Sequence, residues 1–131
     1  MDSRHVYFRR VNLKGDGHRP LIVSEFGGKT WAVEGHVFNP DKTYGYGSCK
    51  TREELNEAVV RLYMDEVLPC VKQGLCGAVY TQVSDVEDEI NGLVTYDRKV
   101  VKLDPEKMLP VAAALQQAIG EKEVANSGEI G

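Results

Sequence analysis

The stretch Leu21-Ile22-Val23-Ser24-Glu25-Phe26 decides the fold class of this chain. It is an almost continuous apolar run that carries one carboxylate near its end, and Gly27-Gly28 stops it. A short apolar run bounded by glycines predicts a strand that is buried on both faces, as in a parallel sheet covered by helices. The stretch from Leu75 to Gln82 has the same character and predicts a second buried strand.

A long helix is predicted between these two strands, over residues 52–73. Thr51 can cap its first turn, and Glu54, three residues later, completes a capping box. Pro69 should kink or tighten the last turns, because proline cannot donate to the carbonyl four residues back, and Gly74 should end the helix. The apolar residues of this segment recur at helical spacing: Leu55, Val59, Leu62, Tyr63, Val67, Cys70 and Val71.

A second helix is predicted after Asp104-Pro105, where a capping Asp is followed by proline at the first helical position. Pro110 leaves the course of its first turns open. Residues 120–131 are expected to form a flexible tail. The apolar stripe of this helix comprises Met108, Val111, Ala112, Leu115 and Ile119.

The order strand, helix, strand, helix is typical of an α/β fold with parallel pairing. We therefore expect the strands near residues 21–25 and 77–82 to be parallel and adjacent, with the helix packed across them. In such folds the chemistry lies at the carboxyl ends of the strands, where Glu25 and Gln82 fall. Two βα units cannot close a barrel, which needs eight. The chain is therefore either an open sheet or the last part of a barrel.

Composition and charge exclude several classes of function. The chain has 131 residues, the size of one domain, and its 42% hydrophobic and 27% charged residues are typical of a globular protein. A formal net charge of −4 offers no basic surface for nucleic acid. No apolar stretch approaches the roughly 20 residues of a membrane span. The N-terminus lacks a signal-peptide segment, so we expect a cytoplasmic protein that binds neither nucleic acid nor membranes.

The sequence indicates no metal or cofactor site. Its three cysteines lack a zinc-like spacing and are expected to be buried free thiols, and its histidines share no ligand spacing. The acidic run at 85–89 predicts a solvated surface rather than a calcium loop, because Ile90 stands where an EF-hand loop needs glycine.

Three segments together resemble glycoside hydrolase family 2, which includes β-galactosidases and β-glucuronidases. The stretch 20–28 resembles the seventh barrel strand of that family, in which a Glu followed by an aromatic and a small residue is the nucleophile. The stretch 74–82 resembles the eighth strand, with Tyr80 where the family usually has a sugar-contacting aromatic, often Trp. The stretch 91–99 resembles the turn that follows the barrel, and the resemblance covers about residues 5–118.

The resemblance implies that residues 1–119 are the C-terminal portion of a glycosidase catalytic domain, a partial (β/α)8 TIM barrel consisting of its last two βα units with parallel strands. It implies a retaining β-glycosidase that hydrolyses O-glycosyl bonds of a β-linked sugar substrate. Glu25 is the expected nucleophile, and Tyr80, Trp31 and His5 are the expected substrate-binding residues. A non-proline cis peptide is expected between Tyr80 and Thr81.

A retaining glycosidase needs a second carboxyl group about 5–5.5 Å from the nucleophile. In the family this acid/base residue lies on an earlier strand, so we expect the isolated chain to be inactive. We also expect it to bind a missing N-terminal barrel portion or to self-associate, because sheet edges and apolar strand residues would lack cover. These strand residues include Leu21, Val23, Ala78 and Val79.

A second hypothesis is a stand-alone α/β binding or interaction module without catalysis, in which Glu25 is a solvated loop charge. Tyr80 would then be a core aromatic, Trp31 a hydrophobic plug and His5 a surface histidine. Two departures from the family's pattern leave the identity of the sugar open: Tyr80 replaces the commoner Trp, and Val100-Val101 replace a frequent Pro.

Overall fold

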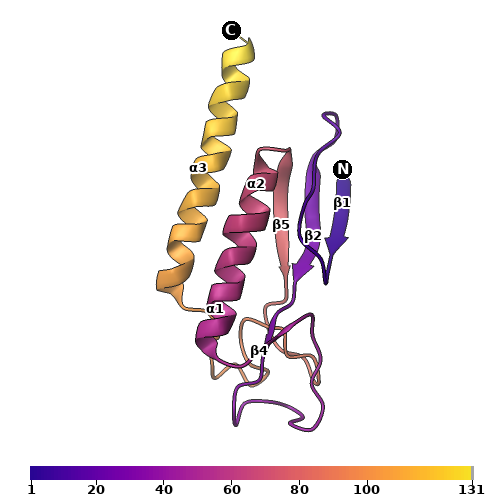
Figure 1. Cartoon of the computed structure of the whole chain (residues 1–131), viewed down its shortest axis with the longest axis vertical. Helices are drawn as coiled ribbons and strands as arrows, with labels where there is room; N and C mark the ends of the chain where they lie inside the picture. Colours follow the sequence, from indigo (N-terminus) through magenta and orange to yellow (C-terminus); the bar gives the residue numbers. More distant parts are fainter. Residues whose placement is uncertain (131) are drawn as a thin grey trace.

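Three parallel strands form the main sheet, in the order β1-β2-β5 (Figure 1). They are β1 (Asp2–Val6), β2 (Leu21–Gly27) and β5 (Leu75–Thr81). The structure, a computed structural model, describes the backbone of residues 1–130 and the side chains of residues 1–121. The parallel pairing of β2 with β5 confirms the prediction for these two strands. The sheet has one strand more than the two expected, because Asp2–Val6 also pairs with β2, and it does not close into a barrel.

One continuous helical segment precedes β5 and consists of α1 (Arg52–Arg61), η1 (Leu62–Val67) and α2 (Leu68–Val71). Its beginning confirms the predicted cap, since the backbone N–H of Glu54 donates to Oγ1 of Thr51 at 3.1 Å. A second, two-stranded sheet lies within the long segment before this helix and pairs β3 (Thr30–Trp31) with β4 (Ser48–Cys49).

The helix widens before Pro69 instead of tightening. In the π-helical turn η1, the backbone N–H of Leu68 donates to the carbonyl of Tyr63, five residues earlier. Pro69 has no N–H for the carbonyl of Asp65, four residues earlier. Nη2 of Arg10 donates to that carbonyl at 2.7 Å. The connection between β1 and β2 therefore satisfies the acceptor that Pro69 leaves free.

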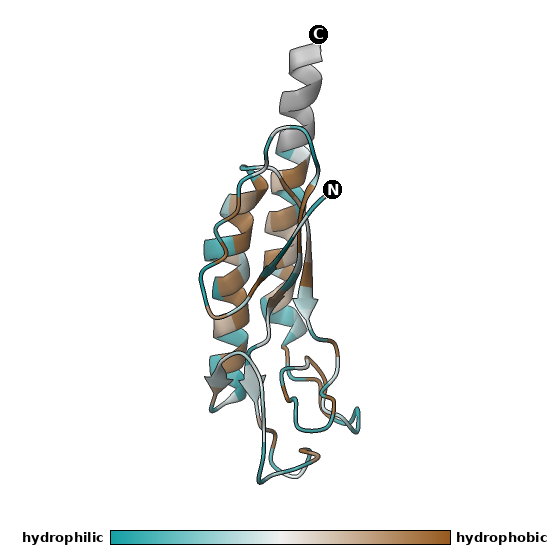
Figure 2. Ribbon diagram, turned by 90° about the vertical axis from the view of Figure 1, so that its right-hand side faces the viewer, coloured by the Kyte–Doolittle hydropathy of each residue, from teal (hydrophilic) through white to brown (hydrophobic). Residues whose placement is uncertain are grey.

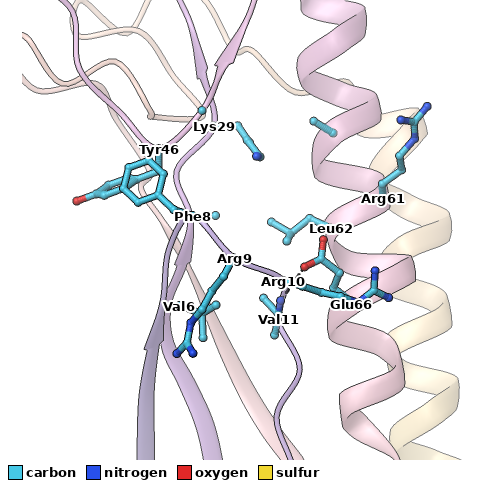
Figure 3. A pocket seen from close by; sticks show the side chains of 13 residues that line it. Val6, Phe8, Arg9, Arg10, Val11, Lys29, Tyr46, Arg61, Leu62 and Glu66 are labelled. Carbon is cyan, nitrogen blue, oxygen red and sulfur yellow. Dashed lines mark hydrogen bonds between the residues drawn. The ribbon is translucent and has the colours of Figure 1, made fainter.

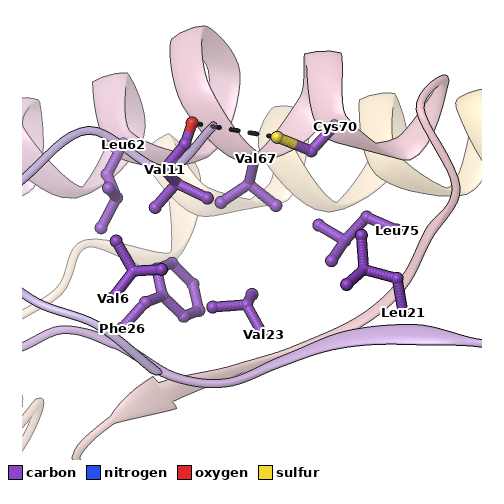
Figure 4. Close-up of a cluster of buried hydrophobic side chains, with 9 residues drawn as sticks. All are labelled: Val6, Val11, Leu21, Val23, Phe26, Leu62, Val67, Cys70 and Leu75. Carbon is purple, nitrogen blue, oxygen red and sulfur yellow. Dashed lines mark hydrogen bonds between the residues drawn. The ribbon is translucent and has the colours of Figure 1, made fainter. Parts of the chain in front are cut away.

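The helices cover one face of the main sheet and build the hydrophobic core with it (Figure 4). Leu21 and Val23 are fully buried there, so the expectation that they lack cover is wrong. Ala78 is exposed and Val79 is 56% exposed, as expected for strand residues that no helix covers. The core cluster consists of Val6, Val11, Leu21, Val23, Phe26, Leu62, Val67, Cys70 and Leu75.

Helix α3 (Pro105–Ile130) lies beside the α1–α2 segment (Figure 1). Only part of its predicted apolar stripe is buried against the rest of the molecule: Val111 is buried, whereas Ala112 is exposed and Ile119 is 44% exposed. Its backbone is helical as far as Ile130, and so includes most of the range 120–131 that was predicted to be a flexible tail. The side chains from residue 122 onward lie outside the described part, so the flexible tail stays a prediction. Within the described part of the chain, no helix has the length and apolar character that crossing a bilayer requires.

A buried ion pair holds the segment between β5 and α3. Nζ of the fully buried Lys102 donates to Oδ1 of Asp85 at 2.8 Å and to the carbonyl of Ile90 at 3.0 Å. Burial lowers the pKa of Lys102, and the neighbouring Asp85 opposes that shift. The prediction that the acidic run 85–89 is a solvated surface is therefore wrong for Asp85, because its buried carboxylate neutralises the charge of the buried Lys102. The loops at this end of the molecule are otherwise largely hydrophilic (Figure 2).

Candidate active site

Glu25 lies near the carboxyl end of the central strand, and a β-bulge sets the face to which it points. The pairing with β1 passes from Val23 directly to Glu25 and leaves Ser24 as the extra residue. Strict alternation would place Glu25 on the helix-covered face together with Val23. The bulge instead turns Phe26 into the core and keeps the Glu25 side chain 45% exposed. The carboxylate is therefore accessible at a strand end.

The carboxyl ends of all three strands meet at Glu25. The hydroxyl of Tyr7, just after β1, lies 2.9 Å from Oε2 of Glu25 and 2.8 Å from Oγ1 of Thr81, the last residue of β5. An ionised carboxylate can only accept, and the Tyr7 hydroxyl carries one proton. Tyr7 therefore donates to Glu25, and the Thr81 hydroxyl can donate to Tyr7. Nδ1 of His5 lies 3.4 Å from the same Oε2.

A group of tyrosines forms a wall beside the carboxylate. The rings of Tyr7 and Tyr46 stack with centroids 3.9 Å apart and planes 19° apart, and Tyr44 meets Tyr46 edge-on at 5.5 Å. Burial raises the pKa of Tyr7; its hydrogen bond with Thr81 opposes this, and its hydrogen bond to Glu25 adds to it. Hydrogen bonding with Tyr44 and burial raise the pKa of Tyr46 to about 12. Both phenols therefore stay protonated near neutral pH.

A second carboxylate, Glu89, influences the pKa of the same tyrosines. Its backbone position is set by a bridge to Tyr44: the N–H of Tyr44 donates to the carbonyl of Asp88 at 2.7 Å, and the N–H of Ile90 donates to the carbonyl of Tyr44 at 2.9 Å. The negative charge of Glu89 raises the pKa of both Tyr7 and Tyr46. Glu89 therefore lies within electrostatic reach of the tyrosine pair beside Glu25.

A buried amide fixes the Glu89 side chain. Nδ2 of Asn91 donates to Oε1 of Glu89 at 3.3 Å, and Oδ1 of Asn91 accepts from Nε2 of Gln82 at 2.9 Å. Asn91 is fully buried.

The Thr81–Gln82 peptide bond is cis, one bond later than the expected position between Tyr80 and Thr81.

The structure brings one of the three expected substrate-binding residues to Glu25, namely His5. Tyr80 lies in the core, where its ring meets Phe26 edge-on at 5.7 Å and its hydroxyl is buried without a hydrogen-bond partner among the described residues. Trp31 lies in the small β3–β4 sheet, and none of the ring contacts between described side chains joins it to the tyrosine wall. A sugar contact by Tyr80 or Trp31 stays a prediction.

A cavity of about 630 Å³ that Tyr46 helps to line opens between the loops after β1 and β2 and the α1–η1 helix (Figure 3). Val11 and Leu62 contribute apolar surface, and the ammonium group of Lys29 points into the space. Tyr46 borders both this cavity and, through Tyr7, the Glu25 cluster. Across the described side chains, His, Cys, Asp and Glu form no group of three or more that could hold a metal ion.

Three residues of the cluster were not predicted from the sequence to belong to a site: Tyr7, Tyr46 and Glu89. A signal for Tyr7 was present, because it lies in a short β-prone run, Val6-Tyr7-Phe8, and strand ends carry the chemistry of parallel sheets. Tyr46 stands between Gly45 and Gly47 in the long segment 29–50. Because glycine has no side chain, neighbouring groups can approach the backbone closely there. Comparison with known proteins adds no relative: no family model matches the chain, and no curated protein matches it significantly.

Proposed function

We propose that residues 1–119 are the C-terminal portion of a retaining β-glycosidase barrel, with β1, β2 and β5 as its last three strands and Glu25 as the nucleophile. The observation that carries this proposal is the hydrogen bond of 2.9 Å from Tyr7 to Oε2 of Glu25 at the carboxyl ends of parallel strands. In parallel α/β folds this edge of the sheet is where active sites form.

The geometry of Glu25 suits nucleophilic attack on an anomeric carbon. Oε2 is held by Tyr7 and faces His5, whereas Oε1 has no hydrogen-bond partner among the described residues. Oε1 is therefore the oxygen that attacks. A nucleophile held on a rigid strand end reacts with little cost of reorganisation. In the proposed step the bond between Oε1 and the anomeric carbon forms as the glycosidic bond breaks, and the aglycone oxygen leaves with a proton from the acid/base residue. Water later hydrolyses the covalent glycosyl-enzyme.

The acid/base carboxylate is proposed to come from barrel strands outside this chain. The helix-free face of the sheet and the exposed Val79 are the surface that such strands would cover. The partners proposed for the chain are accordingly a β-linked sugar and either an N-terminal barrel portion or a second copy of the chain. Loss of general acid/base assistance alone typically costs about 10²–10⁴-fold in rate, so we expect no detectable turnover of aryl β-glycosides by the chain alone.

A second candidate function, a stand-alone α/β binding module, is favoured by the closed core. The helices bury Leu21 and Val23 completely without help from another chain. In that case Glu25 and Tyr7 form a polar cluster at a strand end and transfer no glycosyl group.

Covalent trapping separates the two candidates. A 2-deoxy-2-fluoro-β-glycoside with a dinitrophenolate leaving group needs no acid to depart, so a nucleophile alone can form the adduct. We expect the intact mass of the chain to increase by one fluoroglycosyl group. Glu25→Gln should abolish this increase, and Glu57→Gln, which changes an exposed helix glutamate, should not. Unchanged mass with gluco-, galacto- and manno-configured reagents would reject the glycosidase proposal.

A further inference from the structure

We propose that Glu89 determines the sugar specificity of the Glu25 site: it accepts hydrogen bonds from the hydroxyl groups of a neutral sugar ring and disfavours sugars that carry a carboxylate. The inference rests on the proposed function, because it names the substrate class of that same site.

A series of direct contacts joins Glu25 to the backbone of Glu89. Glu25 accepts from Tyr7, whose ring stacks on Tyr46, and the edge of Tyr44 meets Tyr46. Tyr44 in turn forms the backbone bridge with Glu89. The negative charges of Glu25 and Glu89 both raise the pKa of Tyr7, and that of Glu89 also raises the pKa of Tyr46, so both carboxylates lie within electrostatic reach of the tyrosines.

A second path joins the same two carboxylates through the end of β5. Thr81 contacts Tyr7 at 2.8 Å, and the next residue, Gln82, donates to Asn91 at 2.9 Å. Asn91 then donates to Oε1 of Glu89 at 3.3 Å. Because Asn91 is fully buried, Glu89 is anchored on this side. Its other oxygen, Oε2, has no hydrogen-bond partner among the described residues and is free to accept from a ligand.

The chemistry of this arrangement selects neutral, hydroxyl-bearing sugars. An aromatic face packs against the C–H side of a pyranose ring, and a carboxylate oxygen accepts from ring hydroxyl groups in strong, charge-assisted hydrogen bonds. Glu25 and Glu89 together place two negative charges within electrostatic reach of Tyr7. A uronic acid bound there would bring a third negative charge, and like charges in a partly desolvated site repel each other.

The test compares how the chain binds three methyl β-glycosides: the glucoside, the galactoside and the glucuronide. Binding is followed by saturation-transfer NMR of the ligands. We expect the wild-type chain to bind at least one neutral glycoside and to bind the glucuronide much more weakly. Glu89→Gln should reduce the affinity for the neutral sugar about tenfold and increase the affinity for the glucuronide. The glutamine keeps an oxygen for Asn91, so the fold should persist.

Asp88→Asn is the matched control. It removes one negative charge from the adjacent residue, whose side chain faces Lys42 at 3.8 Å, and leaves the backbone bridge to Tyr44 intact. We expect it to leave the ratio of glucoside to glucuronide affinity unchanged. Equal changes in the Glu89 and Asp88 variants, or no change in the Glu89 variant, would overturn the specificity role.

The outcome also distinguishes this inference from the proposed function. A chain that forms the fluoroglycosyl adduct at Glu25 but binds glucoside and glucuronide equally contradicts only the role of Glu89. A chain that forms no adduct and binds none of the three glycosides contradicts the glycosidase proposal and the inference with it.

Discussion

The hydroxyl of Tyr7 lies 2.9 Å from Oε2 of Glu25, so the residue that follows β1 donates a hydrogen bond to a residue of the neighbouring parallel strand β2 at the carboxyl edge of the sheet. The Ser24 bulge makes this contact possible, because it turns Glu25 away from the helix-covered face. The pair links the fold of the chain to its proposed chemistry, since one oxygen of the carboxylate is held and the other is free.

The charge of Glu25 should be detectable in the titration of Tyr7. Burial raises the pKa of Tyr7, and the negative charge of Glu25 raises it further, because a nearby anion disfavours the phenolate. Glu25→Gln should therefore lower the pKa of Tyr7. The ring resonance of Tyr7, assigned with Tyr7→Phe, can be followed by NMR against pH. The Glu57→Gln chain should titrate like wild type, and an unchanged or higher pKa in Glu25→Gln would contradict the contact.

The last residue of β2, Gly27, should tolerate no side chain. Gly27 has φ +83°, and a Cβ there would overlap the ring of Tyr80. Gly35 has a similar φ of +80° with open space around it, which makes Gly35→Ala a control for backbone strain alone. Strain should cost both variants about 1–2 kcal/mol, and overlap should cost Gly27→Ala about 1–3 kcal/mol more. Urea unfolding measures the difference, and equal losses would contradict the packing of Tyr80 on Gly27.

Local patterns predicted the helix and two of the strands well. The cap at Thr51 and the apolar stripe from Leu55 to Val71 determine the helix. The apolar run that ends at Gly27 determines β2, and the run that follows Gly74 determines β5. The strand Asp2–Val6 was not predicted, because its exposed residues Ser3, Arg4 and His5 hide the apolar signal. It forms because β2 offers it an edge for pairing, which is a tertiary effect that local propensity does not contain.

The buried ion pair should be essential to the segment after β5. Lys102→Met leaves the Asp85 carboxylate buried without its cation, and the loss of one partner typically costs about 3–5 kcal/mol. Lys99→Met removes an exposed lysine nearby and should change stability by less than about 0.5 kcal/mol. Urea unfolding of both variants checks this. A Lys102→Met chain as stable as Lys99→Met would show that the pair is dispensable.

The uncovered side of the sheet should drive association of the isolated chain. Val79 on the edge strand β5 is 56% exposed, and burying it in a dimer should strengthen the complex about tenfold. Val79→Lys should weaken self-association by about that factor in sedimentation experiments over a wide range of concentrations. Val86, a loop residue that is 55% exposed, provides the control variant Val86→Lys. A wild-type chain that stays monomeric at all concentrations would favour the stand-alone module.

The candidate site was predictable only in part. Glu25 lies near the end of an apolar strand, but the resemblance of residues 20–28 to a glycosidase strand is what selected it, together with His5, which lies beside it. Tyr46 and Glu89 come from long loops whose course depends on contacts between distant segments, such as the bridge of Tyr44 to Glu89. The burial of Asp85 was missed because its partner Lys102 is 17 residues away, and an acidic run without a visible cation resembles a solvated loop.

The most direct test of the central claim is to locate the label after reaction with the fluoroglycoside. Tandem mass spectrometry of the digested chain identifies the side chain that carries the fluoroglycosyl group. The proposed mechanism predicts that the label lies on Glu25 and that Tyr7→Phe slows its formation, because Tyr7 positions the carboxylate. A label on Glu89 or on any residue other than Glu25 would contradict the assignment of the nucleophile.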